Sequence, residues 1–126
     1  MEDGLSHSTI FAINQDKEGN LWFATYDGVN KYDGYNFTVY RHEYTNPNSI
    51  ASDITRCIAI DDSDHIWVGT REGLSLYNHR KNIFSNYYYK KNGINVPINN
   101  IAPIKENWLM LGTTEGILLF DIEKEC

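Results

Sequence analysis

Short runs of apolar and β-branched residues alternate along the chain with clusters of turn-forming residues. Alternation with a period of two, interrupted every few residues by Gly, Asn or Asp, is typical of short antiparallel strands. No stretch shows a helical period. The pattern therefore predicts strands only, at 9–15, 21–25, 29–32, 37–40, 54–60, 66–70, 74–77, 83–89, 100–104, 109–113 and 117–120.

The strand pattern repeats. Segments 16–32 and 61–77 carry aspartate, tryptophan, threonine, glycine and tyrosine at the same offsets, and Trp22 and Trp67 lie 45 positions apart. Segment 105–120 is a weaker copy, in which Met110 takes the place of the tryptophan and Gly116 lies 43 positions after Gly73. A strand-rich repeat of this length is typical of a β-propeller, whose blades are four-stranded antiparallel sheets.

The repeat divides the chain into 1–50 (first blade), 51–96 (second blade) and 97–126 (partial third blade). We therefore expect an all-β fold of about 2.8 propeller blades and an incomplete ring. Burying a tryptophan ring between neighbouring sheets stabilises the stack by about 5 kcal/mol. Trp22 and Trp67 are therefore predicted to be inter-blade core. Trp108 breaks the pattern, and both an exposed position and a place at a blade edge remain open for it.

Composition excludes several classes of function. The 126 residues have a formal net charge of −6 and no basic cluster, which argues against a nucleic-acid or anionic-membrane surface. No apolar run is long enough to span a membrane, and the N-terminus does not resemble a signal peptide, so we expect any such signal outside this chain. The two cysteines and four histidines are scattered without metal-ligand spacing, so no cofactor or metal is expected. The acidic loop residues at 16–18 and 61–64 are interpreted as turn-forming side chains.

The segments Gly-Leu-Ser-His-Ser (4–8), Asp-Lys-Glu-Gly-Asn-Leu-Trp-Phe-Ala-Thr (16–25) and Asp-Gly-Val-Asn-Lys-Tyr-Asp-Gly (27–34) resemble the two-component regulator propeller repeat. Such repeats form the extracytoplasmic sensor regions of hybrid two-component regulators in Bacteroides-type bacteria, which detect oligosaccharides and activate polysaccharide-utilisation genes. The resemblance implies a non-catalytic, ligand-sensing segment located in the periplasm. Members of the family usually have many more blades, so we expect either further blades of a longer parent chain or self-association to complete the ring.

Ligands of propellers generally bind at the mouth of the central channel, where the loops entering the innermost strands meet the turns between second and third strands. Polar and planar side chains at such a mouth suit an oligosaccharide. Tyr26 and Arg71, at equivalent positions of successive repeats, are the first candidates. The full predicted ligand-binding set is His7, Tyr26, Asp27, Asp53, Arg71, Glu72, Asn99 and Thr114.

Two alternative functions stay open from the sequence. Propellers also host glycosidases and polysaccharide lyases, and carboxylates at one mouth would suit an acid–base pair. However, Asp27, Glu72 and Glu115 occupy equivalent turn positions, which favours an architectural role over a unique catalytic pair. The other alternative is a structural propeller module that binds a partner protein. No catalytic residue is assigned.

Overall fold

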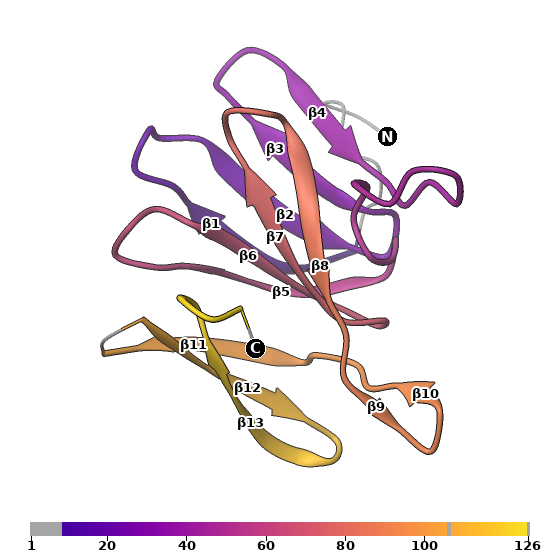
Figure 1. Ribbon diagram of the computed structural model, residues 1–126. Coiled ribbons are helices and arrows are strands. Elements are labelled where there is room, and N and C mark those ends of the chain that lie inside the picture. The colour runs from indigo at the N-terminus through magenta and orange to yellow at the C-terminus, as the bar shows by residue number, and fades with distance from the viewer. Residues whose placement is uncertain (1–8, 106, 126) are drawn as a thin grey trace.

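The computed structural model describes residues 9–105 and 107–125. These residues form three antiparallel sheets and one small hairpin (Figure 1). The first sheet contains β1 (Ile10–Gln15), β2 (Leu21–Thr25), β3 (Val29–Tyr32) and β4 (Phe37–Tyr40); the second contains β5 (Thr55–Ile60), β6 (Ile66–Thr70), β7 (Leu74–Asn78) and β8 (Ile83–Tyr87). The third contains β11 (Asn100–Ile104), β12 (Trp108–Thr113) and β13 (Gly116–Asp121), and the hairpin pairs β9 (Lys90–Lys91) with β10 (Ile94–Asn95).

Each sheet is a simple meander in which strands adjacent in sequence are adjacent in space. The predicted all-β class with four-stranded blades is thus confirmed, and the strand bounds agree with the prediction to within a residue or two. One prediction was wrong: the strand expected at 83–89 ends at Tyr87. The chain then forms the β9–β10 hairpin, because Asn92 and Gly93 both adopt positive φ (54° and 76°). An Asn-Gly pair in that conformation makes a tight two-residue turn.

The sheets stack face to face (Figure 1). β5 contacts both β1 and β11, so the first strands of the three sheets lie next to one another. The fourth strands, β4 and β8, lie at the far edges of their sheets. This radial order, with first strands inside and fourth strands outside, is that of propeller blades. The described part of the chain forms a segment of such a ring and not a closed one.

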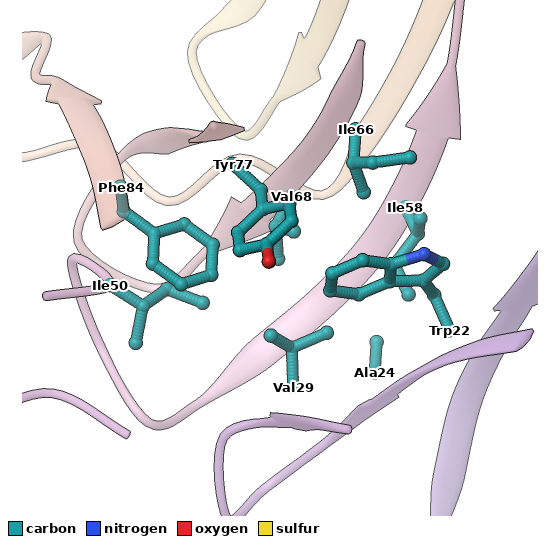
Figure 2. Packing of buried hydrophobic residues seen from close by; sticks show 9 residues of the cluster. All are labelled: Trp22, Ala24, Val29, Ile50, Ile58, Ile66, Val68, Tyr77 and Phe84. Atoms are coloured by element: carbon teal, nitrogen blue, oxygen red, sulfur yellow. The ribbon is translucent and has the colours of Figure 1, made fainter. Parts of the chain in front are cut away.

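One apolar cluster fills the space between the first and second sheets (Figure 2). Trp22 is fully buried there, and its ring centroid lies 4.9 Å from that of Tyr77 in the second sheet. Ile66 and Val68 face the same cluster from β6. The alternation of side chains along β6 sends these two residues to one face and Trp67 between them to the other.

A second cluster lies between the second and third sheets and repeats the first. Trp67 is buried against Phe120, with ring centroids 5.5 Å apart, and Leu109 and Leu111 complete the contact. In both clusters the tryptophan on the second strand of one sheet meets an aromatic ring on the third strand of the next. The prediction that Trp22 and Trp67 form inter-blade core is therefore confirmed. Trp108 is half-buried at the start of β12 and lines a hollow of about 460 Å³.

Each buried tryptophan is held by an aspartate of the preceding loop. The indole Nε1 of Trp22 donates to Asp16 Oδ2 (2.9 Å), and that of Trp67 donates to Asp61 Oδ2 (3.0 Å). The other carboxylate oxygen accepts two backbone N–H groups of its own loop, from Glu18 and Asn20 in one case and from Ser63 and His65 in the other. Asp16 and Asp61 are thus turn-forming side chains, as predicted.

Burial acts to raise the pKa of the Asp16 and Asp61 carboxyls, but the hydrogen bonds from the indole and the loop outweigh it. The pKa of each carboxyl therefore lies below its ordinary value of 3.8. The third repeat has neither partner: Ile104 and Met110 occupy the positions of the aspartate and the tryptophan.

In the described residues no helix is long and apolar enough to cross a membrane.

Asp61→Asn should lower the free energy of unfolding by about 1–3 kcal/mol, because the amide has one acceptor oxygen where the carboxylate uses two. Urea denaturation followed by tryptophan fluorescence measures the loss. Asp62→Asn is the matched control, since Asp62 is exposed in the same loop and its carboxylate has no hydrogen-bond partner among the described residues. The control should change stability by less than about 0.5 kcal/mol. Equal losses in the two variants would contradict the role assigned to Asp61.

Stability should also depend on pH below about 5. A carboxyl whose folded pKa is depressed contributes stability that is fully present above its unfolded pKa of about 4 and is lost as pH falls through the folded pKa. Urea denaturation of the wild-type chain between about pH 6 and pH 3 should therefore show a steady decline below about pH 4 to 5. The double variant Asp16→Asn/Asp61→Asn should decline less steeply, and parallel curves would refute the assignment.

Candidate functional site

Two kinds of loop meet at one end of the stacked sheets. The turns between second and third strands lie there, and so do the links that carry the chain from one sheet to the next (Figure 1). The loops between first and second strands lie at the opposite end. Because these turns and links alternate from sheet to sheet, this end presents variable side chains on a repeated frame.

A threonine and a glycine hold each of the three turns. Thr25 Oγ1 donates to the Gly28 carbonyl (2.8 Å), Thr70 Oγ1 to that of Gly73 (2.9 Å) and Thr113 Oγ1 to that of Gly116 (2.7 Å). The two residues between threonine and glycine are at least partly exposed in every turn. These pairs are Tyr26-Asp27, Arg71-Glu72 and Thr114-Glu115.

The link between β4 and β5 is organised by Asp53. Its Oδ1 accepts the backbone N–H of His42 (2.6 Å), and its carbonyl oxygen accepts that of Gly28 in the first turn (2.7 Å). The His42 ring donates from Nδ1 to the Ile50 carbonyl (2.8 Å). Asp53 therefore fixes the link against the first sheet.

A cleft of about 680 Å³ opens between this link, the second turn and the segment that follows β8. It contains aromatic rings, carboxylates, cationic groups and an amide. Tyr44 and Tyr88 are 96% and 48% exposed. The lining residues are His42, Tyr44, Ala51, Ser52, Asp53, Ile54, Arg71, Glu72, Tyr88, Lys90 and Asn95.

Three of the predicted site residues, Asp53, Arg71 and Glu72, line this one cleft. Thr114 lines a separate hollow of about 490 Å³, one sheet further on, together with Glu115. Asp27 lies outside both and forms a bidentate ion pair with Arg41 (2.9 and 3.0 Å).

The remaining predicted residues are placed differently. The Tyr26 ring packs edge-on against Phe11 with centroids 4.5 Å apart. Asn99 precedes β11, donates its backbone N–H to the Gly112 carbonyl, and has a buried Oδ1 with no hydrogen-bond partner among the residues described. Tyr26 and Asn99 do not line the main cleft. His7 lies outside the described residues.

Sequence reasoning missed the cleft residues that come from the links, chiefly Tyr44, Tyr88 and Lys90. The sequence predicts Tyr88 as part of the strand at 83–89, whereas that strand ends at Tyr87. The signal for Tyr88 was Asn92-Gly93, whose tight turn ends the strand early and places Tyr88 beside the second turn.

The charges of the cleft are balanced. Arg71 and Lys90 are cationic, whereas Asp53 and Glu72 are anionic. The side chains of Arg71 and Glu72 form no hydrogen bond or ion pair with any other described residue. Within residues 9–105 and 107–125, no group of three His, Cys, Asp or Glu side chains is arranged to hold a metal ion. The site is therefore suited to binding a polar ligand through hydrogen bonds and aromatic faces.

The stacked antiparallel sheets, whose first strands are innermost and whose connecting links and second turns share one end, define this chain as part of a β-propeller. Residues 4–27 and 48–72 match the sequence profile of the two component regulator propeller family. These two segments therefore carry the repeat of this family.

Similar proteins include histidine kinase P4 of Formosa agariphila, which is 49% identical over 49 residues; these are 39% of this chain and 4% of that protein. Among solved structures, the extracellular domain of the hybrid two-component system BT3049 from B. thetaiotaomicron matches with a TM-score of 0.84 and 31% identity, over 98% of this chain and 18% of that one. The extracellular domain of the one-component system BT4673 from the same organism has the same fold, with a TM-score of 0.77 at 19% identity, again over 98% of this chain and 18% of that one. The chain thus spans a small part of each of these proteins.

The contacts give the two carboxylates of the cleft different roles: Asp53 holds the backbone of the link, whereas the Glu72 side chain has no bond among the described residues that supports the fold. Asp53→Ala should lower the free energy of unfolding by about 1–2 kcal/mol, because the His42 N–H loses its acceptor. Glu72→Ala, the control in the same cleft, should change stability by less than about 0.5 kcal/mol. Urea denaturation of both variants tests the distinction, and a Glu72→Ala loss as large as that of Asp53→Ala would overturn it.

Proposed function

We propose that this chain is a ligand-sensing segment of the extracytoplasmic sensor propeller of a hybrid two-component regulator or histidine kinase. The ligand is an oligosaccharide, and the segment itself carries no catalytic activity. Its three units, 1–50, 51–96 and 97–126, are propeller blades, and its location is periplasmic. The match of two segments to the propeller-repeat family and the likeness to the extracellular domain of a hybrid two-component system support this proposal.

The main observation behind this proposal is the cleft at the end of the sheets where the turns between second and third strands meet the links, called here the loop end. Exposed tyrosine rings suit the apolar faces of sugar rings, and Arg71, Glu72 and Lys90 offer donors and acceptors to hydroxyl groups. A binding site needs a concavity in which a few polar groups converge beside aromatic surface. This cleft combines both, at the end of the blades where propeller ligands bind.

An enzymatic role has less support from the same geometry. Asp27 is ion-paired with Arg41, and Glu115 with Lys91. A carboxylate that is held by a cation has a stabilised charged form and is a poor general acid. The turn carboxylates therefore do not form the pair of free groups that glycoside hydrolysis needs.

Completion of the ring is part of the proposal. The outer face of the first sheet exposes Phe11 (44%) and Ile13 (59%), and that of the third exposes Ile117 (68%) and Leu119 (55%). Exposed apolar sheet faces are covered in stable proteins by another element or another chain. We infer that further blades of a longer chain, or other copies of this one, cover these faces.

Tyr44→Ala should weaken the binding of an oligosaccharide about tenfold, because the cleft loses its most exposed aromatic face. Isothermal titration of the full chain with a panel of neutral and acidic tetrasaccharides measures the change. Tyr35→Ala is the matched control: Tyr35 is 90% exposed but lies between β3 and β4, at the opposite end of the sheet. Failure of every tetrasaccharide to bind the wild-type chain, or equal weakening by both variants, would contradict the proposal.

A further inference from the structure

The three turns at the loop end differ in how their acidic residue is neutralised. Asp27, Glu72 and Glu115 occupy equivalent positions, each directly before the turn glycine. In the first turn Arg41 holds Asp27 through two hydrogen bonds of 2.9 and 3.0 Å. In the third turn Lys91 holds Glu115. Glu72 has no cation bound to it among the residues that the structure describes.

The strand register shows which residue of the second sheet occupies the position of Arg41 in the first. Tyr40 pairs with Val29 in the first sheet, and Tyr87 pairs with Leu74 in the second. The residues that follow, Arg41 and Tyr88, are therefore equivalent. The second sheet has an aromatic ring where the first has a guanidinium group.

The packing around the turn glycines supports this equivalence. Arg41 Cγ lies 3.3 Å from the position that a Cβ on Gly28 would take, and Tyr88 Cδ1 lies 3.0 Å from the corresponding position at Gly73. Both glycines also face the carbonyl oxygen of the preceding residue, Tyr40 or Tyr87. Arg41 and Tyr88 thus occupy equivalent positions beside their turns, but only Arg41 is cationic and can form an ion pair with the turn carboxylate.

We propose that the Arg71-Glu72 turn, together with Tyr88, is the specificity-determining element of this array, and that it accepts a neutral sugar ring. The ring face lies on Tyr88, adjacent hydroxyls donate to the Glu72 carboxylate, and Arg71 donates to a ring or hydroxyl oxygen. Asp27 and Glu115 play no part in recognition, because their cations already occupy them. This inference rests on the proposed function and names the ligand class of the same cleft.

The charges of the cleft favour a neutral ligand over an anionic one. Arg71 and Lys90 are offset by Asp53 and Glu72, so the lining has no net charge to attract a uronate or a sulfate. A carboxylate without an ion pair also repels an anionic group placed beside it. The same carboxylate is a strong acceptor for hydroxyl donors, of which a neutral sugar has several.

Tyr88→Arg tests the inference, because it restores to the second turn the cation that the first turn has. The new guanidinium should pair with Glu72 and remove the aromatic face, and affinity should fall at least about tenfold. Tyr88→Phe keeps the ring and should bind within about twofold of wild type. Tyr35→Arg adds the same charge at the far end and should leave affinity unchanged.

Isothermal titration of the full chain provides the readout, with neutral tetrasaccharides of glucose, xylose, mannose and galactose and with acidic tetrasaccharides that carry uronate or sulfate. Thermal unfolding of each variant, which should match wild type, separates a loss of binding from a loss of fold. Binding of a neutral tetrasaccharide that Tyr88→Arg abolishes or weakens and Tyr88→Phe retains is the expected result. Wild-type binding that Tyr88→Arg leaves unchanged, or binding of acidic tetrasaccharides alone, would overturn this inference but not the proposed function. Absence of all saccharide binding by the wild-type chain would overturn both.

Discussion

The hydrogen bond from a buried indole to a loop aspartate is the interaction on which the rest of the architecture depends. Trp22 and Trp67 stand between sheets, where an indole N–H without an acceptor would cost about 1–3 kcal/mol. Asp16 and Asp61 remove that cost and close their own loops with the same carboxylate. A single side chain thereby couples the loop at one end of a blade to the core between blades. Because this core sets the spacing of the sheets, it also sets the alignment of the turns that form the cleft.

The stack has a direction. Each tryptophan packs on an aromatic ring of the following sheet, Trp22 on Tyr77 and Trp67 on Phe120. Tyr32, the equivalent ring of the first sheet, is half-buried against Phe37 on the face that no described sheet covers. At the other end Met110 replaces the tryptophan. The two outer faces therefore differ: one carries the aromatic-ring side of the inter-sheet contact and the other carries the tryptophan side. A second copy that covers one of these faces would use its other face, which favours a head-to-tail array over a two-fold pair.

The sequence predicted the features that local chemistry determines. Period-two alternation located the strands, turn residues located their ends, and the repeat of Trp22 at Trp67 identified the inter-blade core. Such reasoning predicted only some of the residues that line the cleft. Arg71 and Glu72 follow from the turn pattern, but Tyr44 and Tyr88 reach the cleft through links whose course depends on contacts between sheets, such as that of Asp53 with His42. A pattern within one strand carries no information on those contacts.

The repeat separates residues that make the frame from residues that are open to change. In each turn the threonine hydroxyl donates a hydrogen bond to the glycine carbonyl, whether the pair between them is Tyr26-Asp27, Arg71-Glu72 or Thr114-Glu115. The side chains of that pair contribute little to the fold, so they differ between blades at little cost in stability. Where the first sheet has Arg41 and the second has Tyr88, the neighbouring turn carboxylate is ion-paired in the first and has no bound cation among the described residues in the second. A propeller can therefore acquire a distinct recognition surface at one blade while the turns of neighbouring blades keep their ion pairs.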